Sequence, residues 1–310
     1  MPRTVLHPVR PRGVRQELQR LAERGAIELV VAGSDDEVAA ALAEGAQVLV
    51  SFRWQERFLT PSLRWVASIS AGFEQFPLTR LREQGVALTT ASGVNAVPVA
   101  EHAMALLLAC SRRIDEAVQH QRERRWQQQG PRLELEGSTL AIVGMGAIGE
   151  RVAELGHAFG MRVLGVKRDP LAYAGCAEAV VAPDGLLEVC AEADVLIGAL
   201  PGGAATRGLL DAEVFDALDG GWFVNVGRGS TVDEAALVAA LESGRVAGAG
   251  LDVVAEEPLA PTSVLWSMPG VVITPHVAGL SPAYGRRFAE LFTRNLAAYE
   301  GTAAWTNRVV

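Results

Sequence analysis

The chain of 310 residues is acidic, with 36 aspartates and glutamates against 28 lysines and arginines and a net charge of −8. This charge argues against a nucleic-acid-binding surface, and the length favours two domains. No apolar run reaches membrane-spanning length, the first residues lack a signal-peptide core, and the three cysteines are too dispersed for a zinc site or a disulfide framework. We therefore expect a cytoplasmic protein without nucleic-acid, membrane or metal partners.

Short apolar runs alternate with helical patterns over the first third of the chain, which favours a parallel sheet covered by helices. Ser34 is expected to cap the second of these helices. This third has no phosphate-binding fingerprint of its own. The predicted strands are 4–9, 27–32, 47–52, 63–70 and 86–91, and the predicted helices are 14–24, 35–43 and 77–84.

A strongly apolar helix is predicted at 97–111, with a proline near its start. A charged, glutamine-rich stretch follows at 112–129 and ends at Gly130-Pro131. We interpret the helix as a connector into a second domain and the stretch as a solvated or subunit-contacting arm, since acids interrupt its basic residues. Because one subunit would not cover both, we expect a homodimer built on 97–129.

The second domain is predicted to be a doubly wound sheet, with helices or turns between its strands. A last helix, about 282–299, is expected to return to the first domain, because the closing residues 305–310 are too few to form a unit alone. The predicted strands are 139–144, 162–166, 179–181, 194–199, 222–226, 247–251 and 271–273.

The fold class is therefore α/β, with two doubly wound parallel-sheet domains and a cleft between them. We expect a Rossmann-type cofactor domain at 97–284, which includes the connector and dimerisation helices at 97–129. A flavodoxin-like substrate domain would combine 1–96 with 285–310.

A glycine-rich turn follows the strand at 139–144, and residues 150–159 after it show helical spacing. Strand, GxGxxG and helix in this order form the dinucleotide fingerprint, in which glycines permit a tight turn and a close approach of backbone to pyrophosphate. The helix N-terminus adds free N–H groups. A plain tight turn is the alternative. The predicted cofactor contacts here are Gly144, Gly146, Ala147, Ile148 and Gly149.

The strand at 162–166 ends in Lys167, Arg168 and Asp169. In NAD enzymes an acidic side chain about 20 residues beyond the fingerprint binds the ribose 2′-hydroxyl. Counting from Gly149, Lys167 takes this position, and two cations would attract a 2′-phosphate. We expect NADP(H) to be preferred, with NAD(H) possible. In the alternative, Asp169 binds the ribose and the cations face solvent.

Ligands of open α/β sheets bind beyond the carboxyl ends of the strands, and three such ends carry reactive groups. Arg228 lies in a glycine-flanked turn, Glu257 precedes a proline, and His276 follows Thr274-Pro275. Each has a simpler interpretation, as a surface salt-bridge partner, a solvated acid and a cap of the next segment respectively. We assign the solvated role to Glu256 instead.

The order of these motifs resembles the NAD(P)-dependent D-isomer-specific 2-hydroxyacid dehydrogenases, from about Val48 to the C-terminus. Within that family the chain looks most like the glyoxylate/hydroxypyruvate reductase branch. The matching pieces are 70–72, 97–102, 144–149, 200–208, 225–233, 251–258 and 274–279.

This resemblance implies that Arg228, Glu257 and His276 are the catalytic residues. A guanidinium can bind the substrate carboxylate and polarise its carbonyl, while histidine donates the proton. A carboxylate on the other ring nitrogen fixes the tautomer and favours the charged form. The resemblance also implies further cofactor contacts at Pro201, Thr206, Val226, Asp252 and Gly279.

By the same resemblance, the backbone N–H groups of Ala71 and Gly72 bind the substrate carboxylate together with Arg228 and His276. An ordinary strand-to-helix turn is the alternative. Arg53 and Trp54, after the strand at 47–52, are candidates for shaping substrate choice. The chain departs from the family where residues 73–75, Phe-Glu-Gln, replace a frequent aspartate.

The sequence thus predicts an oxidoreductase that reduces a small 2-oxo acid, such as glyoxylate or hydroxypyruvate, to the D-2-hydroxy acid. The nicotinamide supplies the hydride and His276 the proton. One alternative is a phosphoglycerate-type dehydrogenase, and another is a non-catalytic, cofactor-sensing protein like the corepressors that resemble this family. A formate dehydrogenase is disfavoured, since that branch carries glutamine where Glu257 stands.

Overall fold

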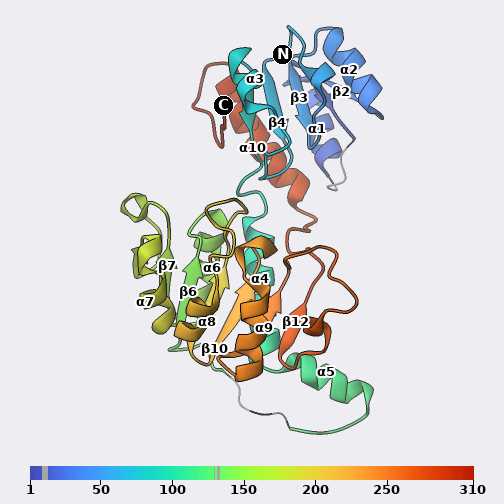
Figure 1. Cartoon of the computed structure of the whole chain (residues 1–310). Coiled ribbons are helices and arrows are strands. Elements are labelled where there is room, and N and C mark those ends of the chain that lie inside the picture. Colours follow the sequence, from blue (N-terminus) through green and yellow to red (C-terminus); the bar gives the residue numbers. More distant parts are fainter. Residues whose placement is uncertain (9–12, 129, 131–132) are drawn as a thin grey trace. The chain divides into compact units, whose positions relative to one another are not determined.

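The computed structural model describes residues 1–8, 13–128, 130 and 133–310, so the end of the predicted arm lies partly outside it. The chain divides into two compact units, Met1–Asn95 with Leu280–Val310 (unit 1) and Ala96–Gly279 (unit 2) (Figure 1). Each unit is built on a parallel sheet, which confirms the predicted fold class. Within the described residues, no helix has the length and apolarity needed to cross a membrane.

Unit 1 contains a five-stranded sheet in the order β2-β1-β3-β4-β5, the flavodoxin-like arrangement. Ser34 caps α2 as predicted, since its side chain accepts a hydrogen bond from the Glu37 N–H. The strands are β1 Arg3–Leu6, β2 Glu28–Val31, β3 Val48–Ser51, β4 Trp65–Ser68 and β5 Ala87–Thr89, and the helices are α1 Val14–Glu23, α2 Asp35–Ala43, η1 Glu56–Phe58, α3 Leu78–Glu83 and α10 Tyr284–Tyr299.

The returning helix α10 belongs to the core of unit 1. The Phe292 ring stacks on Trp65 of β4 with the centroids 4.7 Å apart. Burial raises the pKa of the Tyr284 phenol, so its hydroxyl stays protonated and donates to the Ile69 carbonyl. Tyr284 therefore packs within unit 1, which resumes at Leu280, while unit 2 begins at Ala96.

Unit 2 contains a seven-stranded sheet in the order β12-β11-β10-β9-β6-β7-β8, all parallel. The strand order reverses at β6, which places the topological switch point between β6 and β9. The strands are β6 Thr139–Val143, β7 Arg162–Val166, β8 Ala179–Val181, β9 Val195–Gly198, β10 Gly221–Asn225, β11 Val246–Leu251 and β12 Val271–Ile273. The helices are α4 Ala96–Ser111, α5 Ile114–Arg122, α6 Ala147–Ala158, η2 Pro170–Ala172, η3 Pro183–Gly185, α7 Leu186–Ala191, α8 Ala212–Leu218, η4 Gly229–Thr231, α9 Glu234–Ser243 and η5 Val264–Ser267.

The apolar helix α4 is covered by its own unit, which corrects part of the reasoning for a dimer. Its side chains at Ala103, Leu107 and Cys110 are buried in the same cluster as Ile142 of β6 and Val224 of β10. The helix therefore needs no second subunit to exclude water. By contrast, α5 has no buried residue and extends away from the sheet of unit 2 (Figure 1).

Candidate active site

Three predicted catalytic residues follow three adjacent strands of unit 2. Arg228 follows β10, Glu257 follows β11 and His276 follows β12, and these strands pair in that order. Because parallel strands end at the same edge of a sheet, all three residues lie at the carboxyl edge, where ligands of open α/β sheets bind.

His276 and Glu257 form a hydrogen-bonded pair. The His276 Nδ1 lies 2.8 Å from Glu257 Oε2, and the two side chains are 49% and 38% exposed. With Nδ1–H donating to the carboxylate, the free nitrogen Nε2 is left to exchange a proton with a ligand. The His276 ring is thus engaged with Glu257 and does not cap the following segment. The neighbouring Glu256 is exposed.

The His276 backbone adopts the left-handed conformation, with φ 53°. For a residue other than glycine this costs on the order of 1–3 kcal/mol and persists only where surrounding contacts impose it. The His276 N–H donates to the Asp252 carbonyl at 2.9 Å and to the Thr274 carbonyl at 3.0 Å. Asp252 is 2% exposed, and its carboxylate accepts from the N–H groups of Val277 at 2.9 Å and Ala278 at 3.0 Å. The segment that carries His276 is therefore fastened to Asp252.

Asn225 folds the turn that presents Arg228. Its side-chain oxygen accepts from the Gly227 N–H at 3.0 Å, and its amide donates to the Arg228 carbonyl at 3.2 Å. A Cβ at Gly229 would lie 1.7 Å from the Val254 carbonyl oxygen, so only glycine permits this close approach. The Arg228 side chain is exposed and forms no ion pair with any residue the structure describes, so its guanidinium is open to an anionic ligand.

The glycine-rich turn after β6 fits a dinucleotide. A Cβ at Gly149 would lie 2.3 Å from the Gly144 carbonyl oxygen, so glycine is required for the turn to pack on α6. At Gly146, by contrast, a Cβ would meet no protein atom within 4 Å. Gly146 is the N-cap of α6, no side chain caps this helix, and Ala147 is exposed. An uncapped helix N-terminus with open space before it suits a pyrophosphate.

The basic residues after β7 lie beside this turn. The Lys167 Nζ donates to the Met145 carbonyl at 3.0 Å and lies 5.8 Å from the centre of the Tyr173 ring. Arg168 and Asp169 are both exposed, and the described residues offer neither of them a hydrogen bond or an ion pair. The ammonium is therefore held at the fingerprint rather than in solvent, while Arg168 is open to a ligand.

The remaining predicted cofactor residues lie after the neighbouring strands of the same sheet. Pro201 and Thr206 follow β9, and the Thr206 hydroxyl donates to the Pro201 carbonyl at 2.7 Å. Val226 directly follows β10 and is 5% exposed. Gly279 lies three residues beyond His276, at the end of unit 2. The sheet thus gathers the predicted cofactor residues of unit 2 at its carboxyl edge.

The predicted carboxylate-binding turn lies in unit 1, after β4. The Ser70 hydroxyl donates to the Gly72 carbonyl at 2.7 Å, and the N–H groups of Ala71 and Gly72 find no acceptor within the described part of the chain. Free N–H groups suit an anion. The Glu74 carboxylate lies close by, since a Cβ at Gly72 would come within 2.8 Å of its Oε2. In this chain the carboxylate beside the turn therefore belongs to Glu74, where the family pattern often has an aspartate.

Arg53 and Trp54 border a hollow of about 430 Å³ in unit 1, also lined by Asp35, Phe52, Gln55 and Gln75. Sequence reasoning missed the polar network beneath it, because no motif contains His7. The His7 ring is 3% exposed and contacts Ser51 Oγ at 2.7 Å and Asp35 Oδ1 at 2.6 Å. Ser51 Oγ in turn accepts from the Arg53 N–H at 2.9 Å. The network fixes the start of the loop that carries Arg53.

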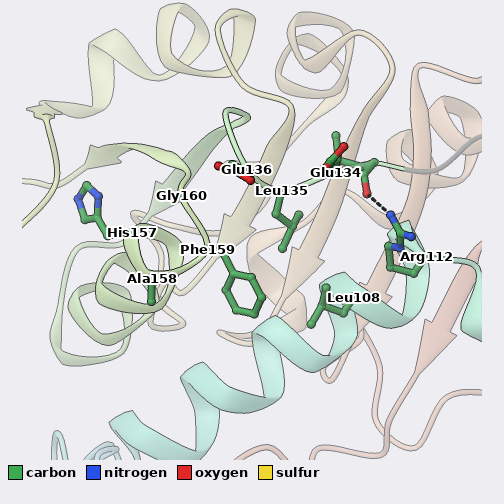
Figure 2. Close-up of a pocket in the computed structure, with 10 residues that line it drawn as sticks. Leu108, Arg112, Glu134, Leu135, Glu136, His157, Ala158, Phe159 and Gly160 are labelled. Carbon is green, nitrogen blue, oxygen red and sulfur yellow. Dashed lines mark hydrogen bonds between the residues drawn. The ribbon is translucent and has the colours of Figure 1, made fainter.

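A hollow of about 640 Å³ on unit 2 contains none of the predicted site residues (Figure 2). Leu108, Leu135 and Phe159 converge in it, and the Arg112 guanidinium at its rim donates to the Leu133 carbonyl at 3.3 Å (Figure 2). We place no chemistry in this hollow, because its centre is apolar.

Comparisons with known proteins identify the family of the chain. The model of the D-isomer specific 2-hydroxyacid dehydrogenase NAD binding domain matches residues 104–278. A glyoxylate reductase of Aeropyrum pernix is 36% identical over 252 residues, which cover 77% of this chain and 74% of that protein. An NADPH-dependent glyoxylate/hydroxypyruvate reductase from Sinorhizobium meliloti, solved with citrate, has a TM-score of 0.79 at 33% identity, covering 99% of this chain and 98% of that one. A D-isomer specific 2-hydroxyacid dehydrogenase from Xanthobacter autotrophicus Py2, solved with NADPH and MES, has a TM-score of 0.80 at 28% identity, covering 100% and 98%.

The chain belongs to the D-isomer-specific 2-hydroxyacid dehydrogenase family. It is an NAD(P)-dependent oxidoreductase that acts on the 2-oxo and 2-hydroxy acid pair.

Proposed function

We propose that the protein is a cytoplasmic reductase of small 2-oxo acids of the glyoxylate and hydroxypyruvate type. The observation that carries the proposal is the His276–Glu257 pair, 2.8 Å apart, at the same sheet edge as an Arg228 that has no carboxylate partner in the described residues. Two of the relatives named above are a glyoxylate reductase and a glyoxylate/hydroxypyruvate reductase, which supports the substrate class.

In this proposal the Arg228 guanidinium binds the substrate carboxylate and polarises the 2-oxo group by charge-assisted hydrogen bonds. The protonated His276 donates from Nε2 to the carbonyl oxygen as it becomes a hydroxyl. Glu257 stabilises the charged ring through Nδ1 and fixes its orientation. A bound nicotinamide cofactor supplies the hydride. We further assign carboxylate binding to the N–H groups of Ala71 and Gly72.

The test is turnover of a panel of 2-oxo acids with NADPH and with NADH. We expect reduction of glyoxylate and hydroxypyruvate to exceed that of 3-phosphohydroxypyruvate. Faster turnover of the phosphorylated acid would favour a phosphoglycerate-type dehydrogenase. Cofactor binding with no turnover of any acid would favour a cofactor-sensing protein.

Replacement of Glu257 by glutamine is expected to lower kcat for glyoxylate reduction by about 10- to 100-fold. The hydrogen bond from His276 Nδ1–H would then reach a neutral amide instead of a carboxylate, so it is weaker and holds the ring less firmly. The measurement is kcat for glyoxylate. Glu256→Gln is the matched control, since it removes the same charge from the adjacent exposed residue and should leave kcat unchanged. A wild-type kcat in Glu257→Gln would contradict the role of Glu257.

We also propose that two copies associate through α5, although α4 needs no such cover. Ile114 and Val118 on α5 are 50% and 41% exposed, and Trp126 just beyond it is fully exposed. Exposed apolar side chains grouped in one segment are typical of an interface.

The dimer proposal predicts that Ile114→Asp with Val118→Asp converts a dimer into a monomer, because buried unpaired carboxylates would oppose association. Sedimentation equilibrium at micromolar concentration measures this. The control is Leu187→Asp on α7, where the side chain is 41% exposed and the mass should not change. A wild-type protein that sediments as a monomer would refute the proposal.

A further inference from the structure

His102 of α4 makes a side-chain contact with the segment that carries the catalytic histidine. Its Nε2 lies 2.8 Å from the Thr274 hydroxyl oxygen, across 172 residues of sequence. The same Nε2 lies 3.5 Å from Asp252 Oδ1. The side chains of His102 and Asp252 are 24% and 2% exposed. The contact between these polar groups is therefore largely shielded from solvent.

The direction of these hydrogen bonds follows from the groups present. The Thr274 hydroxyl lies 2.6 Å from Asp252 Oδ1, and it carries a single hydrogen, which it gives to the carboxylate because a carboxylate only accepts. The Thr274 oxygen is then an acceptor toward His102, so His102 Nε2 carries the hydrogen of that bond. The chain of donation runs from His102 through Thr274 to Asp252.

Asp252 connects the His102–Thr274 hydrogen bond to the segment that carries His276. Its carboxylate receives three donors, namely the Thr274 hydroxyl and the N–H groups of Val277 and Ala278. Its backbone carbonyl accepts the N–H of His276, whose φ of 53° requires outside support. A carboxylate that lacked the Thr274 donor could turn, and the bonds to the residues after His276 would loosen.

We propose that His102 and Thr274 are positioning residues that act on His276 through Asp252. They fix the Asp252 carboxylate, which holds residues 274–278 in the one conformation that aims the His276 ring at the substrate. The inference rests on the proposed role of His276 as proton donor. It gives a function to His102, which lies in the apolar helix predicted at 97–111.

The first test compares Thr274→Val, which removes the hydroxyl at nearly constant volume, with Thr274→Ser, which keeps it. We expect Thr274→Val to lower kcat for glyoxylate by about 10- to 100-fold, because a small misplacement of a catalytic group costs this much. The KM for glyoxylate should change little, since Arg228 is untouched. Thr274→Ser should restore kcat toward the wild-type value. Thr293→Val on α10 is the control, because among the described residues its hydroxyl bonds only to the Ala289 carbonyl of its own helix.

The second test compares His102→Leu with His102→Gln, whose amide keeps an N–H donor at the end of the side chain. We expect the leucine variant to lose kcat and the glutamine variant to recover part of it. Nitrogen-15 NMR of the five histidines should show hydrogen on His102 Nε2 in the wild type and a changed His102 signal in Thr274→Val.

The inference is overturned if Thr274→Val keeps the wild-type kcat, if serine fails to rescue, or if hydrogen is found on Nδ1 of His102 alone. Thermal unfolding of each variant shows whether a lower rate reflects only a smaller folded fraction, which would also overturn it. Activity of His276→Asn is measured beside them. A fully active His276→Asn contradicts the proposed function, whereas an inactive one with an active Thr274→Val contradicts only this inference.

Discussion

Replacement of His276 by asparagine is expected to lower kcat for 2-oxo acid reduction by about 10²–10⁴-fold, the usual contribution of a general acid. Asparagine is chosen because the residue has φ 53°, a conformation that asparagine tolerates better than most residues. Loss of activity would then reflect the missing proton donor rather than a distorted loop. His276→Ala should show a loss of the same order.

The measurements are single-turnover reduction of glyoxylate and, separately, NADPH binding by fluorescence. Binding should persist, because His276 contributes to the chemical step and not to the glycine-rich turn. His157→Ala is the matched control, since the side chain of this exposed histidine of α6 bonds, within the part of the chain that the structure describes, only to the Cys176 carbonyl. If the asparagine variant reduces glyoxylate within a few-fold of the wild-type rate, the protonation step does not depend on His276.

That each unit is built on a parallel sheet covered by helices could be predicted from the sequence, because apolar runs alternating with helical patterns are local signals. Apolar runs bounded by glycine mark the strands, and the run that ends in Gly144 marks the start of the second sheet. Three strands (β7, β8 and β12) match their predicted ranges, and the others differ by one to three residues at one or both ends, where hydrogen bonding rather than apolarity decides the boundary. Each of Arg228, Glu257 and His276 follows a predicted strand, so their position at one sheet edge could be expected from the sequence. Their side-chain contacts were not needed for this expectation.

The contacts that support the site could not be predicted, because they join residues without a shared motif. His102 meets Thr274 across 172 residues, and His7 meets Asp35 across 28. The sequence around Asp35 predicts the first turn of α2, but it does not predict that Asp35 contacts a histidine. The apolarity of α4 likewise shows that the helix is buried, but not that its own sheet covers it.

The wild-type protein is expected to prefer NADPH to NADH, and Lys167→Asp with Arg168→Ala is expected to reverse or abolish that preference. Lys167 is the only lysine of the chain, and its bond to the Met145 carbonyl places the ammonium beside the glycine-rich turn. Arg168 follows it with no ion-pair partner in the described residues, so both cations can meet a 2′-phosphate. A hydrogen bond to a charged group contributes about 1.5–3 kcal/mol, so the preference should be roughly ten- to several-hundred-fold.

The preference is measured as the ratio of kcat/KM for the two cofactors and, without turnover, as the Kd of 2′,5′-ADP against that of 5′-AMP. NADP⁺ should also protect Lys167 from an amine-directed reagent, a reaction that mass spectrometry can follow at a single lysine. Arg245→Asp is the charge control, because this residue precedes β11 at the amino edge of the sheet and pairs with Asp219. A wild type that prefers NADH would assign the ribose to Asp169 instead. A double variant with an unchanged ratio of kcat/KM for the two cofactors would show that neither cation binds the 2′-phosphate.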